Sequence, residues 1–318
     1  MKTTDIALVT GRSNRDLAEK IAKNLGIDLL DEEIVQFKDG EIQAYYNETI
    51  RGRHVFIIQP TFSPAENVLE LLILIDAAKR ASAAEIVAEI VAVVPYYGYS
   101  RQDRKDKPRT SIGAKLMANL LTAAGINRLI TMDLHADQIQ GFFEVPVDHL
   151  YASTVFLPYI RSLNWDNLCI VSPDTGGTKR ASTYAKALKC DFAIGFKQRE
   201  KANEVSTLQI IGNVEGKNVI LLDDIMDTGG TICKAADRVK ELGAQKVYAM
   251  CTHALLSGNA IDRLEASSLD KIIVTDTIPL KRPSDKFEVL SIAPLVSDVI
   301  RSVMDHTSIA SHFEVGNI

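Results

Sequence analysis

Residues 219–231 read VILLDDIMDTGGT, and this stretch decides the fold. Four apolar residues run into two adjacent acids, Asp223 and Asp224, and the glycine-rich DTGGT leads into ICKAADRVKELG, which has helical spacing. This order predicts a buried parallel strand, a tight loop and a helix that begins at the loop. The loop N–H groups and the helix N-terminus suit an anion, while the carboxylates suit Mg²⁺ or sugar hydroxyls. A plain strand–turn–helix connection is the alternative.

Length and composition indicate an ordinary globular protein of two domains. The chain has 318 residues, of which 46% are hydrophobic and 24% charged. Its net charge of −5 argues against a general nucleic-acid binder or a basic membrane-surface protein. Four cysteines without CxxC spacing indicate neither a zinc site nor a disulfide framework. With no long apolar run and no signal-like start, we expect a cytoplasmic protein without a membrane segment.

Apolar runs alternate with helical patterns almost throughout, which is typical of α/β architecture. The pattern also repeats at an offset of roughly 160 residues. The strand, loop and helix of residues 5–26 recur at 168–189, and those of 54–81 recur at 218–244. The first copy has QPTFSP where the second has DDIMDTGGT, so only the second half keeps the acidic loop.

This repeat predicts two similar domains. We place them at residues 1–148 and 149–303, and expect the C-terminal segment, about 304–318, to pack back on the first domain. The Asp-Gly of residues 39–40 predicts a hairpin within the first domain.

Six stretches together resemble the class I ribose-phosphate pyrophosphokinases, whereas the dinucleotide and P-loop motifs are absent from the sequence. They stand in the family's order and span nearly the whole chain: FKDGE at 37–41, PYYGYSRQDRKDK at 95–107, TMDLHADQIQGFF at 131–143, SPDTGG at 172–177, KQREKANEV at 197–205 and DDIMDTGGT at 223–231. The resemblance implies two phosphoribosyltransferase-like domains, each a mainly parallel sheet flanked by helices. It also implies ATP and ribose 5-phosphate as substrates, with transfer of the β,γ-diphosphate to the C1 hydroxyl and release of AMP. Mg²⁺ and a homohexamer with the ATP site shared between subunits are further implications.

The resemblance assigns ATP-binding residues to three stretches of the first half. They are Phe37, Asp39, Gly40, Glu41, Arg101, Gln102 and His135. Taken alone, each stretch more often has a structural explanation: FKDGE as a turn beside a core phenylalanine, RQDRKDKPR as a solvated charged loop, and His135 as a structural histidine. An arginine after a strand can hold phosphates through two parallel hydrogen bonds, which suits the ATP assignment.

The remaining assignments concern catalysis, metal and the sugar phosphate. Lys197 and Arg199 lie between two expected strands and resemble a catalytic flap, with an exposed hairpin as the alternative. His135 and Asp174 resemble metal-associated residues, and because Mg²⁺ prefers oxygen ligands, contact of His135 through water or phosphate stays open. The implied ribose 5-phosphate residues are Arg199, Asp223, Asp224, Asp227, Thr228, Gly229, Gly230 and Thr231.

Two rival functions share part of this pattern. A phosphoribosyltransferase has the DDxxDTGGT loop but normally needs only one such domain. A non-catalytic regulatory homologue tends to lose active-site groups, and those groups are present here. The chain departs from the family where EIVA occurs twice, at 85–88 and 89–92, a change that bears on subunit packing and control more than on chemistry.

Overall fold

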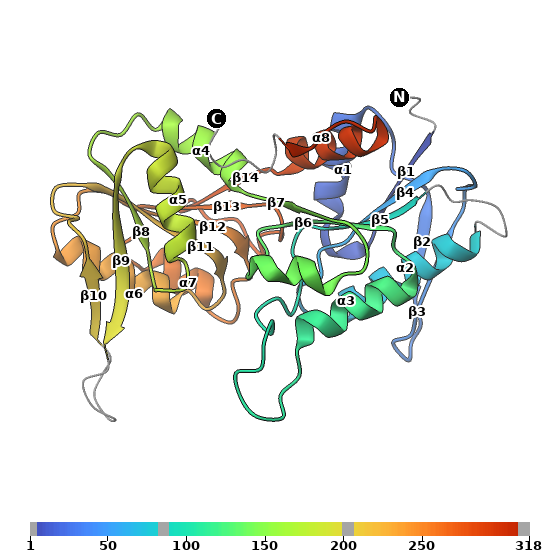
Figure 1. The fold of residues 1–318 in the computed structure, drawn as a ribbon, viewed down its shortest axis with the longest axis horizontal. Coiled ribbons are helices and arrows are strands. Elements are labelled where there is room, and N and C mark those ends of the chain that lie inside the picture. Colours follow the sequence, from blue (N-terminus) through green and yellow to red (C-terminus); the bar gives the residue numbers. More distant parts are fainter. Residues whose placement is uncertain (1–4, 82–88, 199–206, 311–318) are drawn as a thin grey trace. The chain divides into compact units, whose positions relative to one another are not determined.

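The structure, a computed structural model, describes residues 5–81, 89–198 and 207–310 (Figure 1). The described residues as far as Tyr151, together with those from Ile292 onward, form one compact unit, and Ala152–Ser291 form the other. Helices in the described parts of the chain are either too short or too polar to cross a bilayer.

The first unit is built on a five-stranded sheet in which every neighbouring pair is parallel. In spatial order its strands are β1 (Ile6–Thr10), β4 (His54–Ile58), β5 (Glu89–Val94), β6 (Arg128–Met132) and β7 (Val147–Leu150). The helices that follow these strands are η2 (Arg12–Asn14), α1 (Arg15–Leu25), α2 (Glu66–Ala81), α3 (Gly113–Ala124) and η3 (Asp137–Phe142). A separate antiparallel hairpin pairs β2 (Glu32–Gln36) with β3 (Ile42–Tyr46).

The second unit is built on a seven-stranded sheet, parallel except for its β9–β10 hairpin. In spatial order its strands are β10 (Thr207–Ile211), β9 (Asp191–Gln198), β8 (Leu168–Ser172), β11 (Asn218–Met226), β12 (Val247–Ala254), β13 (Lys271–Thr275) and β14 (Phe287–Leu290). Its helices are α4 (Ser153–Ser162), α5 (Thr178–Leu188), α6 (Gly230–Glu241) and α7 (Ala260–Glu265). Strands β8, β11, β12 and β13 are buried almost throughout, as near-continuous apolar runs require in a parallel sheet covered on both faces.

The two sheets repeat one strand order, as the sequence repeat predicts. The order β1–β4–β5–β6–β7 in the first corresponds to β8–β11–β12–β13–β14 in the second. Each copy also carries a hairpin between its first helix and its second strand: β2–β3 after α1, and β9–β10 after α5. The prediction of an α/β fold with two mainly parallel sheets is therefore confirmed.

Helix α8 (Ala293–Met304) follows β14 but packs in the first unit, against α1. Ser297 Oγ donates to the carbonyl of Ile21 at 3.4 Å, and the Arg301 guanidinium donates to the carbonyl of Asn24. The sequence-based bounds assign this helix to the second domain and begin the return at about residue 304. The compact units differ because α8 has an amphipathic pattern whose apolar face is buried on α1.

Candidate active site

The acid pair lies on β11, the middle strand of the second sheet. The strand runs through both acids to Met226, past the point where the sequence pattern ends it. The Asp224 N–H donates to Asp223 Oδ1 at 2.9 Å, and the buried Asp224 Oδ1 lies 3.1 Å from Arg180 Nη1 of α5. Burial raises the pKa of Asp223 well above its usual range, and the charges of Asp224 and Asp174 raise it further. Such crowded carboxylates favour a site that receives a cation or hydroxyl donors.

Residues 227–229 form the loop between β11 and α6 that the sequence predicts, and Gly230 and Thr231 are the first residues of the helix. Helix α6 begins at Gly230, and Gly229 is its N-cap with φ of 73°. A side chain at Gly229 is disfavoured twice: the backbone is left-handed, and a Cβ there comes within 3.0 Å of the Leu264 side chain. The loop thus places backbone N–H groups at the positive end of a helix, directly after the acid pair.

A second DTGGT, residues 174–178, follows β8, the parallel neighbour of β11. Helix α5 begins at Thr178, and Asp174 Oδ1 accepts hydrogen bonds from the N–H groups of Gly176 at 2.9 Å and Gly177 at 3.3 Å. Because β8 and β11 are neighbours, both loops lie at the carboxyl edge of one sheet, where α/β sheets bind ligands. Sequence reasoning selected only Asp174 here; the repeated pentapeptide is the signal that it missed, and Arg180 on α5 gave no signal at all.

The predicted catalytic pair is described only in part. The backbone of Lys197 belongs to β9, which pairs with β8 in parallel. Arg199 lies outside the described residues. Both assignments remain predictions.

In the first unit, Arg101, Gln102 and His135 are exposed at the carboxyl edge of the sheet. Arg101 and Gln102 come after β5 and His135 after β6, and these strands are parallel neighbours. A hydrogen bond of 3.1 Å from Gln138 Nε2 to Asp103 Oδ2 joins the segments that follow the two strands. The fold therefore gathers the exposed groups that the ATP assignment names on this sheet.

The tip of the β2–β3 hairpin gathers the other predicted ATP residues. The Phe37 N–H donates to the Glu41 carbonyl at 2.8 Å, the Glu41 N–H donates to Asp39 Oδ1 at 3.1 Å, and Gly40 has φ of 94°. Phe37 is 47% exposed, so it is not a core residue of the isolated chain. An exposed aromatic ring beside two acids offers both stacking and polar contacts.

Comparison with known proteins identifies the family. The model of the N-terminal domain of ribose phosphate pyrophosphokinase matches residues 6–125, and that of the phosphoribosyl synthetase-associated domain matches residues 197–314. The chain is 53% identical over 308 residues to a ribose-phosphate pyrophosphokinase of Porphyromonas gingivalis, covering 96% of this chain and 97% of that protein. The chain belongs to the ribose-phosphate pyrophosphokinase family. A relative from Chlorobaculum tepidum is 50% identical over 317 residues, with 99% and 97% covered.

The family also agrees in structure. The crystal structure of phosphoribosylpyrophosphate synthetase from Mycobacterium smegmatis matches with a TM-score of 0.88 and 38% identity, covering 95% of this chain and 99% of that chain. The predicted family, fold class and enzyme class are thereby confirmed. Kinase-type enzymes such as this family in general use a divalent metal.

The acids of the second sheet fit such a metal. Asp223 and Asp224 offer a crowded carboxylate pair, and Mg²⁺ is typically held by one or two carboxylates with water and substrate phosphates completing its shell. No cluster of three or more histidine, cysteine or acidic side chains that could hold a metal by themselves occurs among residues 5–81, 89–198 and 207–310. The predicted metal residues, His135 and Asp174, belong to different units.

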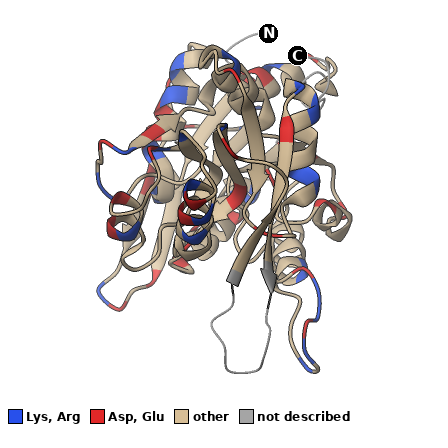
Figure 2. Cartoon of the chain, turned by 90° about the vertical axis from the view of Figure 1, so that its left-hand side faces the viewer, with Lys and Arg blue, Asp and Glu red and all other residues tan. Residues whose placement is uncertain are grey.

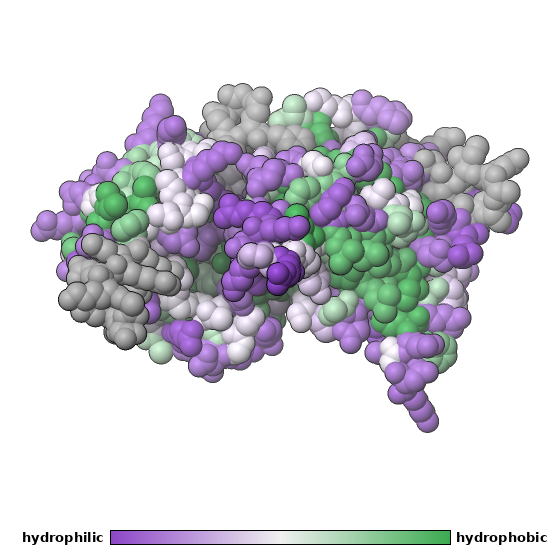
Figure 3. All heavy atoms as spheres, turned by 60° about the horizontal axis from the view of Figure 1, so that its bottom comes forward, coloured by the Kyte–Doolittle hydropathy of each residue, from purple (hydrophilic) through white to green (hydrophobic). Residues whose placement is uncertain are grey.

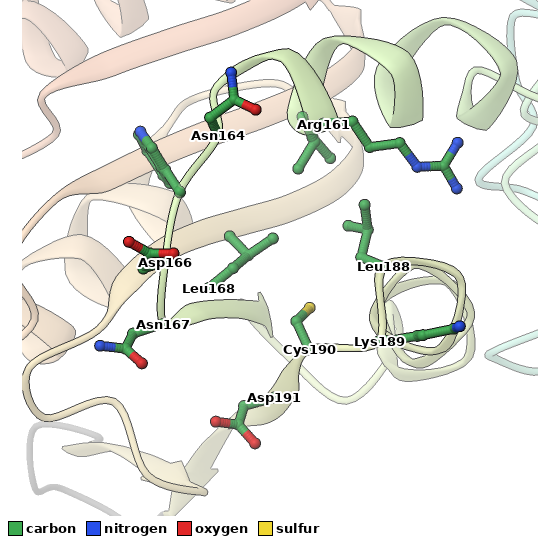
Figure 4. A pocket seen from close by; sticks show the side chains of 11 residues that line it. Arg161, Asn164, Asp166, Asn167, Leu168, Leu188, Lys189, Cys190 and Asp191 are labelled. Carbon is green, nitrogen blue, oxygen red and sulfur yellow. The ribbon is translucent and has the colours of Figure 1, made fainter.

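A pocket of about 540 Å³ lies at the opposite, amino-terminal edge of the second sheet (Figure 4). Leu168 and Asp191, the first residues of β8 and β9, line it together with Trp165 and Cys190. Burial raises the pKa of the Cys190 thiol to about 11, so the thiol is protonated at neutral pH. The pocket contains none of the residues assigned to ATP, metal or ribose 5-phosphate.

Proposed function

We propose that the protein transfers the β,γ-diphosphate of ATP to the C1 hydroxyl of ribose 5-phosphate. The products are 5-phosphoribosyl 1-diphosphate and AMP, and the reaction supplies nucleotide biosynthesis. The observation that carries the proposal is the crowded acid pair on β11, joined directly to an anion loop at the start of α6.

The β11–α6 loop is the site for the sugar phosphate. Loop residues Thr228 to Thr231 bind the 5-phosphate through backbone N–H groups and hydroxyls, aided by the helix dipole. The carboxylates of Asp223 and Asp224 accept hydrogen bonds from the 2- and 3-hydroxyls, and Asp227 orients the loop or the sugar. The ion pair from Arg180 to the buried Asp224 orients that carboxylate, which suits it to accept from a hydroxyl.

ATP binds to the residues that the sequence assigns in the first unit. Arg101 takes triphosphate oxygens in a bidentate geometry, while Gln102 and His135 donate further hydrogen bonds. The hairpin tip holds adenine in the site of a neighbouring subunit: Phe37 stacks on the base, and Asp39 and Glu41 contact its polar edge. The exposure of Phe37 supports this role, since a solvent-exposed ring is available to another chain.

The reaction needs positioning and charge stabilisation rather than a protein nucleophile. The C1 hydroxyl oxygen attacks the β-phosphorus and loses its proton to solvent, and the bond from that phosphorus to the α-phosphate oxygen breaks, releasing AMP. Lys197 and Arg199 neutralise charge that builds on the transferring group. The β9–β10 hairpin, on which Lys197 lies, then excludes water that would hydrolyse ATP.

Mg²⁺ is the proposed cofactor, and when bound it neutralises charge on the phosphate oxygens. Asp174 and His135 are the metal-associated residues that we propose, with His135 acting through a phosphate or a water. Asp174 Oδ1 already accepts two backbone hydrogen bonds, which fixes the orientation of its carboxylate.

A homo-oligomer, which we propose to be a hexamer, fits an exposed apolar surface on the first unit. We call it the α2–α3 face; it includes Leu69 of α2 and Leu116 and Leu120 of α3, which are 50%, 51% and 37% exposed. Figure 3 shows apolar side chains gathered over these helices. Contiguous apolar surface of this kind marks protein–protein contacts.

Nucleic acid and membrane are not proposed as partners. Along the ribbon in Figure 2, segments with basic residues alternate with segments with acidic residues, and the net charge of the chain is −5. A cytoplasmic location remains a prediction from the sequence.

Formation of AMP from ATP tests the proposal and separates it from its rivals. Purified protein with ATP, Mg²⁺ and ribose 5-phosphate should form AMP and the sugar diphosphate in equal amounts, and omission of ribose 5-phosphate or addition of EDTA should stop the reaction. A phosphoribosyltransferase would consume the sugar diphosphate with a nitrogenous base, and a regulatory homologue would do neither. Absence of AMP under the complete conditions refutes the proposal.

A further inference from the structure

The anion loop is held from one side by the segment that follows β12. We call residues 256–263 the brace. Three successive carbonyls, from the last residue of β11 into the loop, accept hydrogen bonds from it: Met226 O from the Leu256 N–H at 3.1 Å, Asp227 O from the Ser257 N–H at 3.0 Å, and Thr228 O from Arg263 Nη1 at 2.8 Å. The brace itself is anchored, because Lys281 Nζ donates to the Leu256 carbonyl at 2.8 Å. The orientation of these three carbonyl groups toward the brace is therefore fixed.

Fixing the carbonyls determines where the N–H groups point. In a trans peptide the C=O and the N–H of the next residue point in opposite directions. The peptide N–H groups of Asp227, Thr228 and Gly229 therefore turn away from the brace one after another. Successive N–H groups on one side of a turn, with Gly229 in the left-handed conformation, form a concave site for an anion.

Arg263 is the one side chain among these three donors, so it can be replaced without altering the main chain. Its guanidinium is oriented by the N-cap residue of α7, because Nη2 donates to Asn259 Oδ1 at 3.3 Å. We propose that Arg263 is a positioning residue: it holds the Thr228 carbonyl so that the Gly229 N–H faces the 5-phosphate of ribose 5-phosphate. This inference rests on the proposed function of the loop.

Arg282, which lies between β13 and β14, provides a matched control because its side chain contacts the same helix. Its guanidinium also binds α7, through Asp262 Oδ1 at 2.6 Å and both oxygens of Glu265 at 2.9 and 2.8 Å. Removing Arg282 therefore loosens α7 without removing the bond to the loop. Comparing variants of Arg263 and Arg282 therefore separates an effect on the loop from an effect on the stability of α7.

The test measures equilibrium binding of ribose 5-phosphate by calorimetry, alongside KM for each substrate. Arg263→Met should raise the Kd and KM for ribose 5-phosphate about tenfold, a shift of about 1.4 kcal/mol. KM for ATP, and kcat at saturating ribose 5-phosphate, should stay within about threefold. Arg263→Lys, which keeps a donor, should restore most of the affinity, and Arg282→Met should leave it unchanged.

The pH dependence of binding distinguishes a direct contact between Arg263 and the phosphate from an effect through the Thr228 carbonyl. A phosphate monoester gains its second charge with a pKa of about 6. If Arg263 acts through the Thr228 carbonyl, the loss in Arg263→Met is the same at pH 5.5 and pH 8; a loss that grows with pH overturns the proposal. Equal losses in Arg263→Met and Arg282→Met, or no loss in Arg263→Met, overturn it as well. Binding is measured without ATP. If the wild-type protein binds ribose 5-phosphate but forms no AMP, the proposed function is refuted while the role of Arg263 can still be tested.

Discussion

Asp223 carries an unfavourable charge in the folded protein, because burial and the neighbouring carboxylates of Asp224 and Asp174 raise its pKa. As pH rises through the ordinary value of 3.8, the unfolded chain releases this proton before the folded chain does, so the folded state loses stability over the interval up to its raised pKa. The acid pair is thus a cost to folding that only the function of the site explains.

Asp223→Asn should therefore stabilise the protein at neutral pH while weakening ribose 5-phosphate binding. We expect Tm at pH 7 to rise by roughly 2–4 °C, which about 1 kcal/mol produces in a domain of 150–250 residues. The gain should shrink as pH falls toward 3.8, because below that value the aspartate is protonated in both the folded and the unfolded state. Thermal unfolding in EDTA between pH 4 and 8 measures this, with the exposed Asp166→Asn as control. A lower Tm for Asp223→Asn at pH 7 contradicts the argument.

Lys197→Ala should reduce turnover without weakening binding of the sugar phosphate. Removing a cation that stabilises the transferring phosphoryl group typically costs about 10³-fold or more in kcat. Kd for ribose 5-phosphate should change by less than about twofold, because the loop that binds it follows a different strand. Steady-state AMP formation and calorimetry measure the two quantities. Lys189→Ala, an exposed lysine at the opposite edge of the sheet, is the control, and near-normal turnover of Lys197→Ala would remove this residue from catalysis.

Among the elements, the two hairpins occupy the same place in the internal repeat but differ in attachment. β2–β3 stands as a separate two-stranded sheet, whereas β9–β10 extends the seven-stranded sheet as its edge. The proposed adenine contact lies on the first hairpin and the proposed flap on the second. The hairpin position in the internal repeat thus carries both of these proposed contacts.

Phe37→Ala should raise KM for ATP while leaving stability and KM for ribose 5-phosphate unchanged. Stacking of an aromatic ring on a base is worth about 1–3 kcal/mol, which corresponds to roughly 5- to 150-fold in affinity. The ring is 47% exposed, so its loss removes little packing from the chain itself. Initial rates against ATP concentration measure the effect. Tyr45→Ala, a 40% exposed aromatic on β3 of the same hairpin, should have no such effect, and equal KM increases in both variants would argue against stacking.

The elements that sequence reasoning predicted well are those in which one local signal decides the structure. The helix of residues 15–25 ends where Gly26 adopts φ of 72°, and the FKDGE turn forms around Gly40 at φ of 94°. Local sequence signals were insufficient where contacts with residues distant in sequence determine the bounds or the packing of an element. β11 continues through its acids because β12 pairs with it as far as Met226, and α8 joins the first unit because its apolar face finds α1.

The same limit applies to the site. The DDIMDTGGT pattern predicted the acid pair and the loop because both lie within one strand–loop–helix segment. The Arg180–Asp224 ion pair and the contact from Arg263 to the Thr228 carbonyl join separate elements, so a linear pattern could not reveal them.

At the scale of the whole molecule, the helix that follows the last strand of each sheet belongs to the other compact unit. The helix after the last strand of the first sheet, α4, packs with α5 in the second unit, and the helix after the last strand of the second sheet, α8, packs with α1 in the first. The first unit is therefore built from two separate stretches of the chain, because a helix that follows the second sheet in sequence covers α1.

The proposed sharing of the ATP site between subunits predicts complementation between two defective proteins. Phe37→Ala lacks the hairpin contact but keeps Lys197, whereas Lys197→Ala lacks the catalytic cation but keeps Phe37. In a mixed oligomer, a subunit with intact Lys197 can receive Phe37 from its neighbour, so random equal mixing should restore about a quarter of wild-type sites.

Co-expression with two affinity tags, followed by sequential purification, yields the mixed oligomers for this experiment. AMP formation is then measured at an ATP concentration below the KM of the Phe37→Ala protein, where each parent variant is nearly inactive. Activity of the mixed oligomers well above the mean of the two parents supports a hairpin that reaches into a neighbouring site. Activity equal to that mean places the hairpin in its own subunit's site, because each chain then carries one defect that no neighbour can repair.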